Sequence, residues 1–299
     1  AGFARVAVVG AGERARAALS GTRAEFPASA PEGAIRLPWN TVAAVKDLEE
    51  LRSGGACPGI AVRTEADLPR AERFLLRGLV KDTEGFMSKH FERKISLALS
   101  RRLVATSVTP NAMTLLSVGI GLLGAVFFLR PTAPSETAGA LLFLLHSILD
   151  GCDGELARLK FQESRYGGLL DFWGDNVVHV AVFSAMAIGW SRMAGESWPL
   201  FLGALAVGGT LASALLVYSR TMAAPKQGPL FTSVAASGPS RLSRVADALS
   251  RRDFIYLVLI LSLLGKARWF LVLAAAGAPV YFLALTAIAL AERRRPRSA

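Results

Sequence analysis

The sequence predicts a mainly α-helical fold: a polytopic membrane bundle of about six transmembrane helices. An interfacial amphipathic helix precedes the bundle, and a small α/β cytoplasmic domain comes before that helix. Three observations lead to this fold class. Of the 299 residues, 52% are hydrophobic, a high share for a soluble protein. Long apolar stretches follow one another from residue 111 onward, and the net charge of +11 is concentrated between them.

Residues 1–83 have the mixed composition of a small soluble domain, and residues 84–299 are predicted to form the membrane domain. In the first part, apolar runs that end at glycines indicate strands, and apolar residues at helical spacing indicate helices. The expected elements are a strand over 3–10, a helix over 41–53, a strand over 59–63 and a helix over 67–80.

Residues 84–103 intersperse apolar side chains with five lysines and arginines between Lys89 and Arg102. Such a pattern predicts a helix that lies in the plane of the membrane interface. A linker helix in water is the alternative. The position directly before a membrane span favours the interfacial helix.

The first span is expected to begin at Thr109 and Pro110, because threonine caps a helix and proline fits its first turn. The apolar stretches then predict membrane spans over residues 111–130, 139–158, 168–190, 197–219, 253–265 and 268–291.

Basic residues set the expected orientation. They precede the first span, fall between the second and third and between the fourth and fifth, and follow the sixth. Cytoplasmic loops carry an excess of lysine and arginine. A multi-pass integral membrane protein with both termini and its functional site on the cytoplasmic side is therefore predicted. Because the basic segments flank apolar spans, membrane lipids rather than nucleic acid are the expected anionic partners.

Four aspartates lie inside the second and third spans. Asp150 and Asp153 are three residues apart, and Asp171 and Asp175 are four apart, so each pair shares a helix face. A short loop joins the two spans and makes them antiparallel neighbours, which brings the pairs together. One acid at the centre of a membrane helix costs roughly 2.5–3.5 kcal/mol. A divalent cation that holds a phosphorylated substrate would compensate this cost, and oxygen ligands favour Mg²⁺, Mn²⁺ or Ca²⁺ over zinc.

Small residues and an arginine accompany the acids. Gly154 and Ala157 leave a hollow beside them, and the guanidinium of Arg158 can bind phosphate. Acids, metal and arginine together indicate phosphoryl transfer. Structural ion pairs between helices are one alternative, and a membrane transporter or ion pathway that uses the intramembrane acids is another.

The complete pattern resembles the signature of the CDP-alcohol phosphotransferases. It consists, in order, of Asp150, Asp153, Gly154, Ala157, Arg158, Gly167, Asp171 and Asp175. The resemblance covers residues 84–291 and implies Mg²⁺-dependent transfer of a phosphoalcohol group from a CDP-alcohol, such as CDP-diacylglycerol or CDP-inositol, to a hydroxyl acceptor, with release of CMP. Mn²⁺ is the alternative metal, and the resemblance also implies a homodimer.

The resemblance assigns a role to each residue of the signature. Asp175 is implied to act as the general base. Two metal ions are implied, and their ligands would be Asp150, Asp153, Asp171 and Asp175. The nucleotide of the donor would be bound by Gly154, Ala157, Arg158 and Gly167.

The N-terminal region resembles a shortened nucleotidyltransferase domain of the kind fused to this membrane domain in enzymes that make and use CDP-inositol. The resemblance lies in residues 59–81, where Ala61 and Arg63 stand in place of metal-binding acids. The region is therefore expected to be inactive and to dock on the membrane domain. Gly10 and Gly12 follow the first strand in a pattern that fits either a nucleotide-binding turn or an ordinary turn.

The acceptor is expected to be a lipid or a polyol phosphate, with inositol phosphate as one candidate. A phosphorylated acceptor needs a basic anchor on the cytoplasmic side. The candidates are Arg220, Lys226, Arg241 and Arg244. A basic loop that contacts only lipid headgroups is the alternative for this segment.

Overall fold

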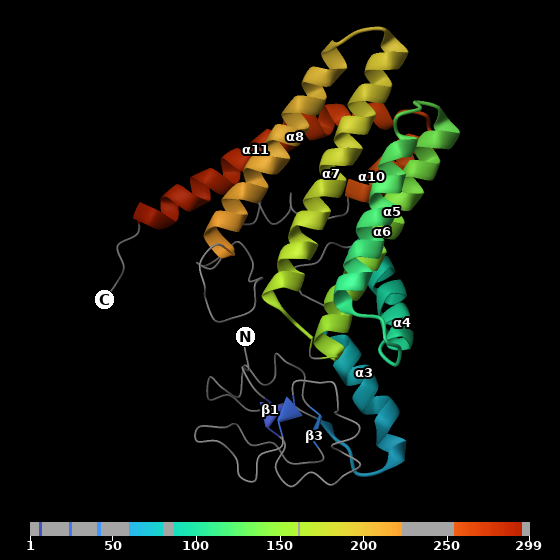
Figure 1. Ribbon diagram of the computed structural model, residues 1–299, viewed down its shortest axis with the longest axis vertical. Coiled ribbons are helices and arrows are strands. Elements are labelled where there is room, and N and C mark those ends of the chain that lie inside the picture. The colour runs from blue at the N-terminus through green and yellow to red at the C-terminus, as the bar shows by residue number, and fades with distance from the viewer. Residues whose placement is uncertain are drawn as a thin grey trace.

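The computed structural model describes residues 6–7, 24–25, 41–42, 60–79, 87–160, 162–222 and 254–294. Within these ranges the protein is mainly helical (Figure 1). After a 3₁₀ turn at Glu65–Asp67, the described helices are α3 Leu68–Gly78, the π-helical turn Ser88–Glu92, α4 Arg93–Leu103, α5 Pro110–Phe127, α6 Ala133–Leu159, α7 Arg165–Ala194, α8 Trp198–Thr221, α10 Phe254–Leu263 and α11 Ala267–Arg294.

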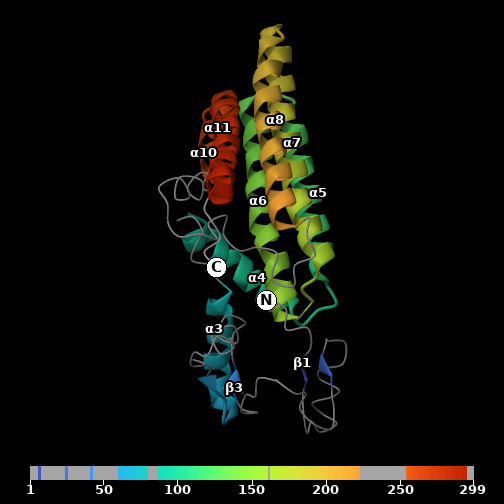
Figure 2. The same cartoon turned by 90° about the vertical axis from the view of Figure 1, so that its left-hand side faces the viewer.

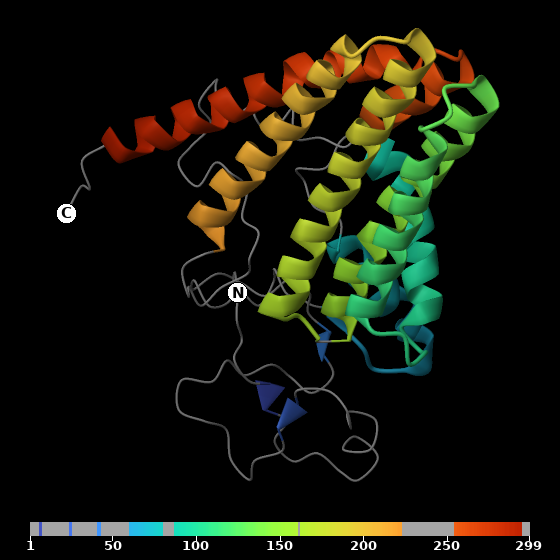
Figure 3. The same cartoon turned by 45° about the horizontal axis from the view of Figure 1, so that its top comes forward.

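The long helices α5, α6, α7 and α8 run side by side (Figures 1 and 2). Helix α5 packs against α6 and α7, α8 packs against α7 and α11, and α10 packs against α6. Figure 3 shows α11 crossing α8 obliquely. Glycine permits the close approach of α5 and α7: a β-carbon at Gly174 would lie 2.6 Å from Val118 Cγ2. Small residues at such crossings are typical of helix pairs in membranes.

Four helices are long and apolar enough to cross a membrane, namely α5, α7, α8 and α11. Helix α6 has the length, with 27 residues, but it carries five charged residues: Glu136, Asp150, Asp153, Glu155 and Arg158. Helix α10 has 10 residues, about 15 Å of helix, which is half the thickness of a hydrocarbon core. The prediction of an integral membrane protein is thus supported, whereas the count of six spans and the cytoplasmic orientation stay predictions.

The strands of the N-terminal region form two short pairs. Strand β1 Val6–Ala7 runs parallel to β2 Ala24–Glu25, and β3 Thr41–Val42 runs antiparallel to β4 Ile60–Ala61. The last of these lies where a strand was expected, and α3 confirms the helix expected from residue 67.

The start of one expected helix in this region was wrong. Thr41 and Val42 pair with β4 instead of opening a helix over 41–53, in keeping with the preference of β-branched residues for extended structure. Residues 43–53, Gly10 and Gly12 lie outside the described residues. The α/β character of residues 1–83 therefore stays a prediction.

Helix α4 lies between α3 and the helix bundle (Figure 2). Arg101 donates from Nε and Nη2 to the two carboxylate oxygens of Glu72 on α3, at 2.6 and 2.9 Å. Toward α6, α4 buries Ser96 and Ser100, while Phe91 just before it and Ile95 stay 49% and 41% exposed. An exposed apolar side next to the bundle supports the predicted position in the membrane interface.

Candidate functional site

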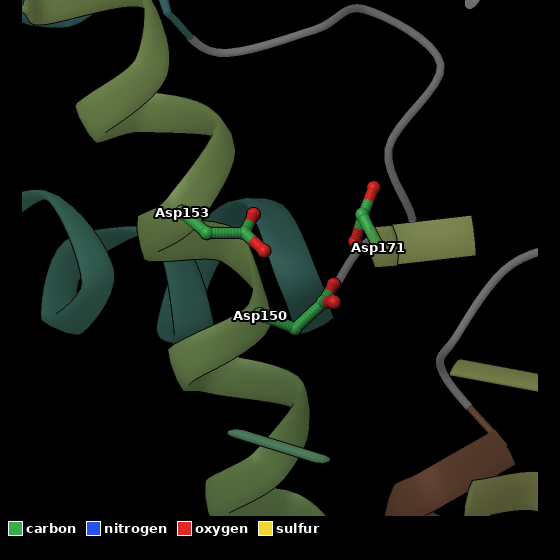
Figure 4. Close-up of side chains that lie close together, drawn as sticks. All are labelled: Asp150, Asp153 and Asp171. Atoms are coloured by element: carbon green, nitrogen blue, oxygen red, sulfur yellow. The ribbon is translucent and has the colours of Figure 1, made fainter. Parts of the chain in front are cut away.

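Three of the four aspartates meet between α6 and α7. One carboxylate oxygen from each of Asp150, Asp153 and Asp171 lies within 4.8 Å of the other two (Figure 4). Asp150 and Asp153 on α6 are buried, with 6% and 5% exposure, and Asp171 on α7 is half-buried. The predicted convergence of the two acid pairs is thus confirmed for these three residues.

Local sequence explains why the trio meets. The spacing of Asp150 and Asp153 places both on one side of α6. Helix α7 begins after Ser164, whose Oγ accepts a hydrogen bond from Gly167 N at 3.0 Å. This cap sets the point at which α7 starts, and Asp171 follows one turn later, beside the C-terminal end of α6.

Helix α5 adds a third wall to the site. Thr109 caps this helix by accepting from Ala112 N at 3.3 Å, and Pro110 follows in the first turn, as predicted. One turn further on, the hydroxyl of Thr114 donates a hydrogen bond to Asp153 Oδ2. The sequence analysis missed Thr114. A usable signal was present, because Asn111, Thr114 and Ser117 recur every third residue on an otherwise apolar helix.

Asp175 lies one turn beyond Asp171 on α7 and is not one of the trio. Its Oδ1 is 3.6 Å from Nε2 of His146 on α6. His146 is buried, and its Nδ1 lies 3.0 Å from the carbonyl oxygen of Ser117. A carbonyl only accepts hydrogen bonds, so Nδ1 carries a proton and Nε2 faces Asp175.

The negative charges of the four aspartates repel one another. Asp171 interacts electrostatically with Asp150, Asp153 and Asp175. At an effective dielectric constant of 20, two like charges 4 Å apart repel by roughly 4 kcal/mol. A divalent cation among the trio would turn this repulsion into attraction. Three carboxylates also form an all-oxygen donor set, which fits Mg²⁺ or Mn²⁺. The residues present therefore fit the metal predicted from the sequence.

The two signature glycines have different surroundings. A β-carbon at Gly154 would find Arg158 Nη1 as its nearest neighbour, at 3.6 Å, which is ordinary van der Waals contact. A β-carbon at Gly167 would lie 3.0 Å from both Asn111 Oδ1 and Ser164 Oγ. The packing of the chain itself thus accounts for glycine at 167, whereas at 154 there is room for one more carbon in contact with the Arg158 guanidinium.

Two further groups of residues lie around the trio. Lys160 Nζ, just after α6, donates to the carbonyls of Thr106 and Val108 at 2.7 and 2.6 Å. On another side of α6, Glu155 is fully buried and accepts from Arg93 Nη1 and Ser96 Oγ of α4, at 2.6 and 2.7 Å. These contacts fix the start of α4 and the loop between α4 and α5 to the acid-bearing helix. The sequence analysis did not predict either of them.

Of the predicted acceptor anchors, only Arg220 lies within the described residues. Its Nη2 donates to the carbonyl of Ala289 on α11, at 3.1 Å, and the residue is exposed. Lys226, Arg241 and Arg244 lie outside the part of the chain that the structure describes, so their role as anchors stays a prediction.

Residues 107–242 match the family model described as CDP-alcohol phosphatidyltransferase. The chain is 39% identical over 127 residues to the bifunctional IPC transferase and DIPP synthase of Thermococcus kodakarensis, covering 42% of this chain and 28% of that protein. It is 34% identical over 192 residues to the protein of the same name from Rubrobacter xylanophilus, covering 60% and 42%. The chain thus spans less than half the length of these relatives.

Among solved structures, the chain is similar to the phosphatidylinositol phosphate synthase of Mycobacterium tuberculosis with CDP-DAG bound. The two are 20% identical with a TM-score of 0.43, and the match covers 64% of this chain and 92% of that chain.

Proposed function

We propose that this chain transfers a phosphoalcohol group from a CDP-alcohol to a hydroxyl acceptor and releases CMP, a proposal supported by the match of residues 107–242 to the CDP-alcohol phosphatidyltransferase model. The observation that carries the proposal is the convergence of Asp150, Asp153 and Asp171 within 4.8 Å. A buried site with three negative charges suits a cation-dependent reaction of a phosphorylated substrate.

Asp150, Asp153 and Asp171 would hold Mg²⁺ or Mn²⁺, and a second ion would need Asp175 as an additional ligand. When bound, the metal would neutralise charge on the phosphate oxygens of the donor. The support for this assignment is the all-oxygen donor set and the mutual repulsion of the carboxylates.

Asp175 would act as the general base that takes the proton from the attacking hydroxyl. It lies one turn from Asp171 on the same helix, and its carboxylate faces His146 Nε2 rather than joining the trio. A carboxylate outside the trio remains available for proton transfer while the trio holds metal.

The donor nucleotide would lie over Gly154 and Ala157, with its phosphates against Arg158. The space at Gly154 supports this placement, because a β-carbon would fit there in contact with Arg158 and meet no protein atom closer than 3.6 Å. A guanidinium beside that space matches the planar, bidentate recognition of phosphate oxygens. Gly167 would contribute by letting the start of α7 approach Asn111.

The candidate substrates are inositol compounds, because the N-terminal region resembles a domain of enzymes that make and use CDP-inositol. The curated relatives are named bifunctional IPC transferase and DIPP synthase. We infer a donor that is CDP-inositol or CDP-diacylglycerol and an acceptor that is inositol phosphate or a related polyol phosphate. Residues 84–299 would catalyse the transfer as a homodimer at the cytoplasmic face. Residues 1–83 would dock on them as an inactive nucleotidyltransferase-like domain, and the contact between Glu72 and Arg101 supports this docking.

A transporter or ion pathway is not favoured. Acids that line a pathway would be distributed through the depth of the membrane, whereas here three acids share one site. The family match also concerns a transferase.

The proposed function is tested by incubating the purified chain with Mg²⁺, a panel of CDP-alcohols and a panel of acceptors. CMP release is expected for one donor–acceptor pair and should stop when Mg²⁺ is chelated. CMP release from no pair, or release that is independent of metal, would contradict the proposal.

A further inference from the structure

Thr114 lies where three helices meet beside the acid cluster. It belongs to α5 and is 2% exposed. Its hydroxyl donates to Asp153 Oδ2 on α6. Its methyl carbon Cγ2 faces Gly174 on α7, 3.9 Å from the place that a β-carbon there would occupy. One side chain of α5 therefore bonds to the acid-bearing helix α6 and lies beside α7.

We propose that Thr114 is a positioning residue for Asp153: its hydroxyl holds the carboxylate in the orientation that binds metal. The inference rests on the proposed function, because it concerns the same metal site. It assigns a role to a residue outside the signature pattern, on a helix that contributes no acid to the trio.

The carboxylate needs such support. The terminal torsion of aspartate is broad and has no sharply preferred value, so backbone position alone does not fix the plane of the carboxylate. A buried hydrogen bond to one oxygen removes that freedom. Hydrogen-bonded partners of metal ligands commonly have this role, and their loss lowers metal affinity by roughly 10–100-fold.

Thr114 is itself well fixed. Threonine branches at Cβ, which restricts its first torsion in a helix. The hydroxyl has one proton and two acceptors in reach, Asp153 Oδ2 and the carbonyl of Pro110 at 3.3 Å. An ionised carboxylate is the stronger acceptor, so the proton is directed to Asp153.

The test compares side chains that separate the hydrogen bond from the packing. Thr114→Val keeps the shape and removes the donor, whereas Thr114→Ser keeps the donor and removes the methyl group. Thr210→Val is the matched control. Thr210 lies on α8, and its hydroxyl donates to the carbonyl of Ala206 in its own helix, at 2.8 Å. Mn²⁺ alone is titrated into each purified full-length variant by calorimetry, without donor or acceptor.

We expect Thr114→Val to bind Mn²⁺ roughly 10–100-fold more weakly than the unaltered protein. Thr114→Ser should stay within about threefold, less than the 10-fold lower bound of that loss, and Thr210→Val should show no change. In turnover assays, excess metal should restore the rate of Thr114→Val, because the variant lowers metal affinity rather than removing a reacting group. If Thr114→Val does not fold, Thr114→Ala should show the same loss of affinity.

Two outcomes overturn the inference. One is unchanged Mn²⁺ affinity in Thr114→Val, and the other is an equal loss in Thr114→Ser, which would make packing the cause. Asp150→Ala separates this failure from failure of the proposed function. If Asp150→Ala loses Mn²⁺ binding while Thr114→Val keeps it, only the role of Thr114 is wrong. If the unaltered protein does not bind Mn²⁺, the metal site and the inference fail together.

Discussion

Asp153 shows how residues at this site depend on neighbours far away in the sequence. The residue shares a face of α6 with Asp150, meets Asp171 from α7 and accepts a hydrogen bond from Thr114 on α5. The contacts with Asp171 and Thr114 reach across two different helix interfaces. A substitution at any of these positions should therefore affect metal binding more than it affects the fold.

At the residue scale, Asp175→Asn should lower CMP release by about 10²–10⁴-fold. The amide keeps the size of the side chain but cannot take a proton. Metal-dependent binding of the CDP-alcohol should change little, because the trio is intact. Glu163→Gln is the matched control, since Glu163 is an exposed carboxylate in the loop before α7. Turnover of Asp175→Asn close to that of this control would refute the role of base.

Gly154→Ala should weaken donor binding without harming the fold. The added carbon meets no protein atom closer than 3.6 Å, and alanine favours the helix by about 1 kcal/mol relative to glycine. The melting temperature should hold or rise, while overpacking against the nucleotide costs about 1–3 kcal/mol, or roughly 5–150-fold in affinity. Calorimetric titration with a CDP-alcohol measures the effect. Gly119→Ala, at an open position of α5, is the control and should bind donor normally. Equal donor affinity in both variants would show that the donor does not bind beside Gly154.

At the scale of elements, α4 is fixed to the acid-bearing helix α6 by a buried ion pair. The buried carboxylate of Glu155 on α6 is held by Arg93 and Ser96 of α4, one turn from the cluster. The other arginine pair of α4, between Arg101 and Glu72, is largely exposed, with side-chain exposures of 62% and 41%. The two pairs differ in burial and so should differ in their effect on stability.

Arg93→Ala should lower stability by about 3–5 kcal/mol, because it leaves the Glu155 charge buried without its cationic partner. Arg101→Ala, which breaks the exposed pair, should cost about 0.2–1 kcal/mol. The apparent melting temperatures of the two variants in detergent give the comparison. A loss in Arg101→Ala as large as that in Arg93→Ala would show that burial does not set the contribution of these pairs.

At the scale of the whole molecule, metal binding and folding should be linked. The repelling carboxylates come from two helices, so a cation that bridges them stabilises the packed bundle. At a metal concentration of 100 times the dissociation constant, the stabilisation is about 2.7 kcal/mol. We expect Mg²⁺ to raise the apparent melting temperature, and EDTA to reverse the rise. Asp150→Ala should abolish this shift. An equal shift in that variant would place the stabilising ion elsewhere.

The sequence by itself determined the helices and the residues to examine. Apolar runs and the Thr109–Pro110 cap predicted α5 to α8, because hydrophobic periodicity and capping are local properties. The same local spacing placed Asp150 beside Asp153. Local pattern failed at Thr41 and Val42, whose strand depends on pairing with Ile60 and Ala61.

Only the tertiary structure decided which side chains meet. It left Asp175 outside the predicted cluster and opposite His146, and it directed Thr114 and Arg93 toward partners 39 and 62 residues away in the chain. Spacing along one helix says which face a residue occupies, but not which neighbour that face meets. That choice follows from the close packing of several helices at once, in which small residues such as Gly174 set how near the helices approach.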